Sequence, residues 1–221
     1  MARSFGQYCG LARALEAVGE RWALLIVRDL LVGPRRFTDL RNGLPRIPTN
    51  VLATRLKELE EAGVVQRRLL PRPTSAVVYE LTEYGRDLEP AITALGRWGA
   101  RSLSEPQPDD VLTVDALTMA LRSTFTPSAH RGHGRVRYQL LVGPIRLTAT
   151  VHRGVLSIAE GVEPEADITI ETGPQIKAVM AGELAPADAI DRGVVRVAGD
   201  PALLELFART FPVGPAPVAA R

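Results

Sequence analysis

The chain of 221 residues contains 27 Lys and Arg against 25 Asp and Glu, and 46% of its residues are hydrophobic. This balance excludes the low hydrophobicity and high net charge of disordered chains, and the length allows one large domain or two small ones. The longest apolar stretch, Ala23–Val32, is interrupted by Arg28 and Asp29, so no membrane span is expected. The first residues form no apolar signal core, and the single cysteine, Cys9, cannot make an intramolecular disulfide. We therefore expect a cytoplasmic protein that has no membrane partner.

The charge is unevenly distributed about a seam at residues 104–110, where two prolines and three acids interrupt helical periodicity. We interpret this seam as a linker between a domain at 1–103 and a second domain at 111–221. Residues 1–104 hold 16 Lys and Arg against 11 acids, whereas residues 105–221 hold 11 against 14. The halves therefore carry net charges of +5 and −3. This pattern indicates a basic and an acidic domain, and chance scatter is the alternative.

The N-terminal half has the pattern of a helix-turn-helix. A tight turn at Pro45–Pro48 precedes a further helix, which Thr49 can cap and Gly63 can terminate. Earlier segments with helical spacing of apolar residues are Leu11–Val18, Trp22–Val32 and Phe37–Leu44.

The helix from Thr49 has an apolar stripe of Leu52, Leu56 and Leu59. Its first turns carry groups able to bond base edges and phosphates, whereas acidic residues follow in its last turns. We therefore expect its N-terminal end to enter the major groove of DNA, although an ordinary solvated helix would also place polar residues outward. The predicted contact residues are Thr49, Asn50, Ala53, Thr54 and Lys57.

A predicted hairpin follows this helix. Residues 64–70 and 76–81 are strand-like, and Pro71–Ser75 between them reads as a loop with Arg72 at its tip. Such a basic wing can contact the DNA backbone or minor groove; a surface hairpin with solvated arginines is the alternative. The cations assigned to DNA contact, including two that precede the Phe37 segment, are Arg35, Arg36, Arg67 and Arg72.

These features resemble the HxlR-type winged helix-turn-helix transcriptional regulators from about Cys9 to Trp98. The resemblance implies a dimeric bacterial regulator that binds promoter DNA through the helix from Thr49 and the wing near Arg72. Some members of that family sense electrophiles or oxidants through a cysteine near the position of Cys9. The residues that carry the resemblance are Cys9, 19–22, 36–40, 47–52, 55, 56, 59, 63, 64 and 79–82.

A dimer seam is predicted on the helix that follows the wing. Thr82 is its expected N-cap, and Pro90 should kink it before it ends near Leu103. Packing of this stripe onto its own domain is the alternative. A two-fold homodimer would present two recognition helices to half-sites about one DNA turn apart, which predicts a pseudo-palindromic operator in double-stranded DNA. The seam residues are Tyr84, Leu88, Ala91, Leu95 and Trp98.

The C-terminal half is predicted to be an antiparallel sheet covered by helices, so that the whole chain is α+β with two domains. Gly143–Pro144 and Arg153–Gly154 mark turns between strands. The expected helices are 111–125, 174–181, 186–191 and 201–211, and the expected strands are 135–142, 145–151, 155–158, 166–171 and 194–197.

Residues 109–212 resemble sterol-carrier-protein-type lipid-binding domains. The resemblance rests on Thr172–Pro186 and on Gly193–Asp200, and it implies an apolar pocket for a hydrophobic small molecule. Plain core packing is the alternative for every residue assigned to such a pocket. The lining residues expected from periodicity are Leu117, Leu121, Tyr138, Leu147, Ile176, Met180, Leu206, Phe207 and Phe211.

Catalytic signals are weak. His130 and His133 lie three residues apart in a Gly-rich segment, and no cysteine or carboxylate lies near enough in sequence to complete a metal set. His152 stands alone, and the chain has neither a Gly-x-Ser-x-Gly elbow nor a phosphate-cradling glycine loop. We expect no metal, no cofactor and no enzymatic activity.

The sequence therefore predicts a transcriptional regulator, and a repressor in particular, whose C-terminal domain binds a hydrophobic effector that changes operator affinity. A thiol sensor that acts through Cys9 is one alternative, against the simpler expectation that Cys9 is a small buried residue. A lipid carrier or assembly protein that uses the winged domain only to dimerise is the other.

Overall fold

The computed structural model describes residues 4–71 and 75–215 of a mixed α and β chain. The chain divides into two compact units, Met1–Ile92 and Thr93–Arg221. The division falls within α6 (Glu89–Ala100), before the seam at 104–110 that we interpreted as a linker. In the described ranges, no helix is long and apolar enough to cross a membrane.

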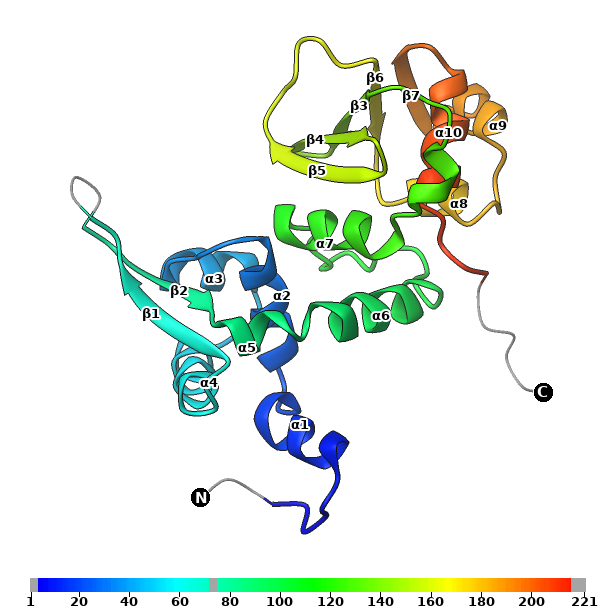
Figure 1. Cartoon of the computed structure of the whole chain (residues 1–221). Coiled ribbons are helices and arrows are strands. Elements are labelled where there is room, and N and C mark those ends of the chain that lie inside the picture. The colour runs from blue at the N-terminus through cyan, green and yellow to red at the C-terminus, as the bar shows by residue number, and fades with distance from the viewer. Residues whose placement is uncertain (1–3, 72–74, 216–221) are drawn as a thin grey trace. The chain divides into compact units, whose positions relative to one another are not determined.

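The first unit is built from helices that precede a two-stranded hairpin (Figure 1). The ends of these elements agree with the predicted ends to within a few residues, because apolar spacing and the glycine and proline breaks mark them. The elements are α1 (Gly10–Val18), α2 (Ala23–Val32), α3 (Phe37–Gly43), α4 (Thr49–Glu61), β1 (Val65–Leu69), β2 (Val77–Leu81) and α5 (Glu83–Arg86).

Buried apolar residues from these elements form the interior of the unit. Leu40 of α3 and the predicted α4 stripe of Leu52, Leu56 and Leu59 are all buried. Burying a leucine side chain stabilises a fold by about 1.5–3 kcal/mol, so the stripe fixes which face of α4 remains outside. The other buried apolar residues of the unit are Ala12, Val18, Ala23, Ile26, Val27, Leu30, Leu44, Ile47, Val64, Val65, Val78, Tyr79, Leu81 and Ile92.

The helix after the wing is broken into α5 and α6. Thr82 caps α5 as predicted, since its hydroxyl oxygen accepts the Gly85 N–H at 3.0 Å. Pro90 lies in the first turn of α6, where its missing N–H has no cost, whereas an uninterrupted helix would leave the Arg86 carbonyl without its donor. The predicted kink is therefore a complete break at Asp87 and Leu88.

The second unit contains a five-stranded sheet in the order β5-β4-β3-β6-β7. Figure 1 shows α8, α9 and α10 gathered beside β6 and β7. The elements of this unit are α7 (Val114–Thr124), a 3-10 turn η1 (Pro127–His130), β3 (Val136–Val142), β4 (Ile145–His152), β5 (Val155–Glu160), β6 (Ile168–Thr172), α8 (Ile176–Met180), α9 (Pro186–Asp191), β7 (Val195–Gly199) and α10 (Ala202–Thr210).

The sheet is mixed, which corrects the expected all-antiparallel arrangement. β3 pairs with β6 in parallel, in a register that places Leu140 beside Ile170 and Val142 beside Thr172. The chain must therefore return across the sheet between β5 and β6, and residues 161–167 make this crossing.

Gln139 holds the crossing in place. This buried side chain donates to the carbonyl oxygens of Leu147 (3.0 Å) and Gly161 (3.1 Å). Its own oxygen accepts the Glu163 N–H at 2.6 Å and the Thr148 hydroxyl at 3.1 Å. An amide satisfied on both sides lets the polar backbone of the crossing lie against the sheet without an unpaired buried group.

The opposite face of the sheet carries the core. The strands alternate as a sheet with one covered face requires, so that Tyr138 and Leu140 of β3 point with Leu147 of β4 into the same cluster. Phe207 of α10 and the following Phe211 complete it, with their ring centroids 4.9 Å apart. Buried residues of α8, α9 and α10 thus pack with the strands in one cluster.

The second half of α6 packs on α7. The Arg97 guanidinium donates through Nε to the Ser123 carbonyl at 2.8 Å, and Gly96 approaches the Ser123 side chain so closely that a Cβ would lie 3.0 Å from its hydroxyl oxygen. This contact fixes one side of the helix and leaves the side of Leu95 and Trp98 exposed.

Candidate nucleic-acid interface

The polar face predicted for α4 is at the surface. Asn50, Ala53, Thr54 and Lys57 are all exposed, while the leucines on the other side of the helix are buried. The Thr54 hydroxyl donates to the Asn50 carbonyl at 2.9 Å, which leaves its oxygen lone pairs for an outside donor. The helix therefore presents an amide, a hydroxyl and an ammonium group outward in its first turns.

The helix start differs from the prediction in one detail. Pro48, not Thr49, occupies the N-cap position, and the side chain makes no capping bond there. Thr49 is instead the first helical residue, and it is exposed. Because buried Ile47 anchors the preceding turn, the hydroxyl of Thr49 is not needed to start the helix.

An internal ion pair positions α4. Arg55, whose side chain is 18% exposed, pairs with Glu58 on its own helix and with Glu20 before α2 at 3.4 Å. Glu20 precedes Trp22, which takes a left-handed backbone conformation at φ 80°. The contact ties α4 to the α1–α2 turn. Periodicity alone did not indicate it, because the partners are far apart in sequence.

The described arginines of the wing are paired with carboxylates of α4 and β2. Arg67 pairs with Glu60 at 2.9 Å and lies over the Tyr79 ring, 5.4 Å from its centroid. The hydrogen bond that Arg67 donates to the Glu60 carboxylate raises the pKa of Arg67 above its ordinary value. Arg68 pairs with Glu80 at 2.8 Å. Both arginine side chains are about half exposed, so the pairs are weak enough for a phosphate to compete with them.

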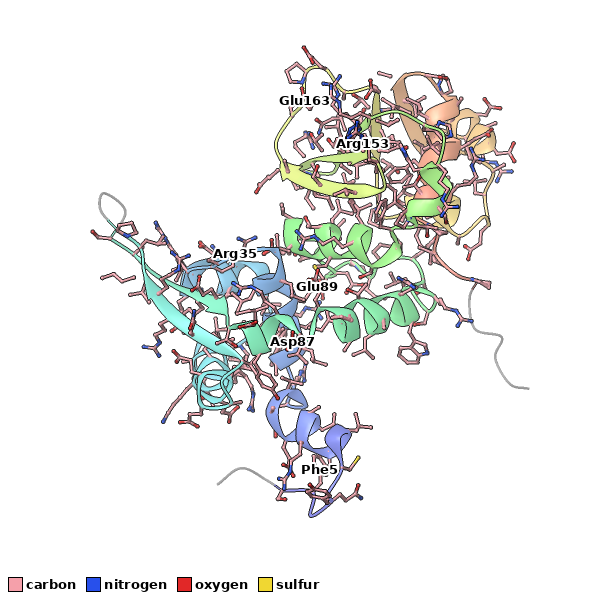
Figure 2. The ribbon with its side chains drawn as sticks, in the orientation of Figure 1. Phe5, Arg35, Asp87, Glu89, Arg153 and Glu163 are labelled. Carbon is pink, nitrogen blue, oxygen red and sulfur yellow. The ribbon has the colours of Figure 1, made fainter. Side chains whose placement is uncertain are left out.

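Of the other predicted cations, Arg35 and Arg36 lie just before α3, and Arg72, the predicted tip, is outside the described residues. Arg35, labelled in Figure 2, exchanges backbone hydrogen bonds with Tyr79 at 3.0 and 2.8 Å, so an isolated β-bridge joins the segment before α3 to the hairpin. Arg36 is exposed, and its backbone N–H donates to Asp39 at 3.0 Å.

The residues of the predicted dimer seam are mostly at the surface. Trp98 is 72% exposed, Tyr84 61% and Leu95 50%, while Ala91 is exposed and Leu88 half-buried. On α6, Ala91, Leu95 and Trp98 follow one another at helical spacing. Large exposed apolar side chains in one line are typical of an association surface.

Cys9 is exposed, which corrects the expectation of a small buried residue. It occupies the N-cap position of α1, and the backbone N–H groups of Ala12 and then Leu11 lower the pKa of its thiol. Hydrogen bonds from helix N-terminal amides favour the thiolate because they stabilise negative charge.

The predicted ligand-lining residues form one hydrophobic core. Tyr138 is central, since its ring lies 5.4 Å from that of Phe207 and 6.2 Å from that of Phe211. Burial raises the pKa of Tyr138 to about 12. Leu121, Tyr138, Leu147, Leu206, Phe207 and Phe211 are buried, and Leu117, Ile176 and Met180 pack against them half-buried.

Of the two histidines, His130 is buried beside this core and His133 is exposed. His130 ends the 3-10 turn η1, is 4% exposed and lies 3.3 Å from the Tyr138 hydroxyl. Its ring is edge-on to that of His133, with centroids 5.6 Å apart. The segment that contains the two histidines therefore begins with a 3-10 turn, which its glycine content did not predict.

An exposed polar face on one helix, a preceding helix joined by a tight turn and an antiparallel hairpin after it together define a winged helix-turn-helix fold. Residues 17–107 match the HxlR-like helix-turn-helix family. The chain is 39% identical over 93 residues to the HTH-type transcriptional regulator YodB of Bacillus subtilis, covering 42% of this chain and 82% of YodB. It belongs to this family, whose members are transcriptional regulators and not enzymes.

Other relatives are similar over the same share of the chain. An uncharacterized HTH-type transcriptional regulator of Mycobacterium tuberculosis, Rv3095, is 44% identical over 97 residues, which are 44% of this chain. The match spans 61% of the length of that mycobacterial protein. Among solved structures, the redox regulator HypR in its oxidized form is 31% identical, with 43% of this chain and 99% of that chain covered and a TM-score of 0.41. The reduced form of YodB is 33% identical, with 46% and 100% covered and a TM-score of 0.39.

Proposed function

We propose that the chain is a DNA-binding transcriptional regulator that inserts the first turns of α4 into the major groove and lays the β1–β2 hairpin against the backbone. The observation that best supports this proposal is the division of α4 into a buried leucine stripe and an exposed face with Asn50, Thr54 and Lys57. Asn pairs with two atoms of adenine, and Lys neutralises a phosphate, so the two would contribute specificity and affinity respectively.

The test separates these two roles. A duplex selected from a random library serves as the probe, and the full chain is titrated at several salt concentrations. Asn50→Ala should weaken binding to the selected duplex about tenfold or more and relax the preference at one base. Lys57→Ala should weaken binding to all duplexes and reduce the salt slope by about one. Arg153→Gln, an exposed arginine in the β4–β5 turn of the second unit, is the matched control (Figure 2). Unchanged affinity and slope in both α4 variants would remove α4 from the interface.

We propose a two-fold homodimer as the binding species and repression as its effect. The exposed line of Ala91, Leu95 and Trp98 on α6 supports the dimer. Two recognition helices related by two-fold symmetry would occupy half-sites about one turn apart, and the operator would be pseudo-palindromic. A reporter gene placed behind the selected duplex should be expressed less when the chain is present; equal or higher expression would exclude repression.

We propose the second unit as the effector-binding unit, with an apolar small molecule as its ligand. The supporting observation is the concentration of aromatic side chains around Tyr138, Phe207 and Phe211, beside half-buried Ile176 and Met180 at the margin of the core. A hydrophobic ligand would enter at that margin and displace core side chains. Mass spectrometry of small molecules extracted from the purified chain tests this; extracts that match those of Met180→Lys, a variant with a charge at the margin, would contradict it.

A thiol sensor is the second candidate, because Cys9 is exposed and the pKa of its thiol is lowered by the amides of α1. The chain has no other cysteine, so Cys9→Ser removes all thiol chemistry. If Cys9 senses electrophiles, N-ethylmaleimide should change the duplex affinity of the wild type and leave Cys9→Ser unaffected. An equal response in both would remove Cys9 from regulation.

A further inference from the structure

A polar cavity lies at one end of the sheet of the second unit, away from the apolar core. Its volume is about 520 Å³, within the range of small-molecule sites. Its walls come from the β3–β4 turn, from the end of β6 with the residues after it, and from the α9–β7 turn. The register places these segments together, since Val142 pairs with Ile145 and Thr172, and Thr172 pairs with Val195.

Glycines shape the rim of this cavity. Gly143 and Gly193 have φ values of 55° and 68°, in the left-handed region where a side chain would be strained. A Cβ at either position would meet no heavy atom within 4 Å, so the space beside them is open. The two turns therefore close tightly without filling the cavity with side chains.

The charge of the cavity is strongly positive. Three arginines, Arg146, Arg192 and Arg196, line it together with a single carboxylate, Glu171. The one pairing among them, Arg196 with Glu171, is loose at 3.7 Å, and both side chains are more than half exposed. Exposed ion pairs of this kind contribute little stability, so an anionic ligand can replace Glu171 as the partner of Arg196.

Two of the guanidinium groups retain donors for a ligand. Arg146 is held in place through Nη1, which donates to the carbonyls of Gly143 (2.6 Å) and Ile145 (2.9 Å) and leaves Nε and Nη2 for other acceptors. Within the described ranges, the Arg192 side chain makes no hydrogen bond or ion pair. Guanidinium groups bind carboxylate and phosphate oxygens through paired N–H donors.

We propose that this cavity binds a small anion that carries a carboxylate or phosphate group, with Arg192 and Arg146 as its principal ligands. An open cavity of this volume accommodates a small molecule, whereas a duplex needs an extended basic surface. Residues 105–221 also carry a net charge of −3, which disfavours a long polyanion. The site is distinct from the apolar core, and it requires no assumption about how the first unit binds DNA.

The experiment measures anion binding to the full chain with two probes, inorganic phosphate and succinate, by calorimetry and amide chemical shifts at constant ionic strength. At least one probe should bind saturably and shift the amides of Gly143, Gly173 and Gly193. The tighter probe identifies the ligand chemistry as phosphoryl or carboxylate. Arg192→Gln should weaken binding about tenfold, the effect expected for a lost charge-assisted hydrogen bond, and Arg192→Lys should retain part of it.

Two further variants distinguish the loss of the Arg192 contact from a loss of binding caused by misfolding. Arg153→Gln changes an exposed arginine just after the far end of β4. At about 3.3 Å per residue, Arg153 lies roughly 23 Å along the strand from Arg146, so this variant should bind the anion as the wild type does. Glu171→Gln removes the competing carboxylate and should tighten binding roughly two- to fivefold, which misfolding cannot imitate.

Non-saturable shifts that are equal in the wild type and Arg192→Gln would overturn the proposal. It would also be overturned if Arg192→Gln lost duplex affinity while neither probe bound saturably, since the arginines would then serve DNA phosphates.

Discussion

His130 is a titratable side chain enclosed in the second unit. It is 4% exposed, it contacts the Tyr138 hydroxyl at 3.3 Å, and His133 is its charged neighbour when protonated. Burial lowers the pKa of His130, and the charge of His133 lowers it further. The neutral imidazole is therefore the form that the folded unit accommodates.

This shift makes the stability of the second unit depend on pH. The unfolded chain protonates His130 near its ordinary pKa of about 6.5, whereas the folded unit does so only at lower pH. Stability should therefore fall as pH decreases below about 6.5 and level off below the folded pKa. Amide hydrogen exchange in β3 and α10, measured at neutral and mildly acidic pH, reports this change. His130→Gln should flatten the dependence, whereas His152→Gln, at an exposed position, should leave it unchanged. Equal slopes in His130→Gln and wild type would contradict the assignment.

Single residues show which side-chain positions the sequence pattern can predict. The exposure of Asn50, Thr54 and Lys57 was predictable, because the helical period relates each to a buried leucine. The exposure of Cys9 was not, since a small residue beside an amphipathic helix fits a core as well as a surface. The ion pair of Arg55 with Glu20 joins residues 35 positions apart, and local periodicity carries no information about such contacts.

At the level of elements, Thr82 joins the wing to the helix after it. Its oxygen accepts the Gly85 N–H at 3.0 Å and its hydroxyl donates to the Gly63 carbonyl at 2.6 Å. Thr82→Ala removes both bonds and should lower the free energy of unfolding of the first unit by about 1–2 kcal/mol. Urea denaturation measures this. Thr38→Ala, at an exposed position in α3, should cost less than about 0.5 kcal/mol, and an equal loss in both variants would exclude a capping role for Thr82.

The crossing between β5 and β6 depends on Gln139. Gln139→Leu keeps a similar volume but leaves the Glu163 N–H and the Gly161 carbonyl without this partner. Each unsatisfied buried group costs about 1–3 kcal/mol, so residues 161–167 should exchange amide hydrogens faster and the unit should lose stability. Gln175→Leu, at an exposed position, is the control. Protection of 161–167 that is unchanged in Gln139→Leu would show that the crossing is held by other contacts.

Elements were predictable to different degrees in the two units. In the first unit, Gly33, Pro34, Pro45 and Gly63 mark the element ends directly, whereas Pro90 predicted only a kink where the structure has a break before α6. In the second unit the strands were recognised, but their directions were not. A strand's alternation is the same in parallel and antiparallel pairs, and the parallel pairing of β3 with β6 depends on a connection whose path the sequence does not specify.

At the level of the whole molecule, association is the property that the exposed apolar residues predict. Trp98 is 72% exposed and Leu95 50%, on the side of α6 that does not contact α7. Leu95→Asp with Trp98→Asp should convert the proposed homodimer to a monomer and weaken duplex binding, because the second half-site contact would be lost. Sedimentation equilibrium measures this. Val162→Asp, at a similarly exposed apolar residue, should remain dimeric. A dimer that survives the double change would place the interface elsewhere.

The pairing of the wing arginines has a consequence for how DNA binding responds to salt. Arg67 and Arg68 already hold Glu60 and Glu80, so a phosphate that takes either arginine exchanges one anion for another and leaves a carboxylate behind. Salt slopes count the ions released on binding. The slope of this protein should therefore be smaller than the number of its arginine–phosphate contacts. Glu60→Gln and Glu80→Gln should steepen it. Acidification that protonates Glu80 should do the same, at a pH below its ordinary range, because hydrogen bonds from Arg68 and Gln66 lower the pKa of Glu80.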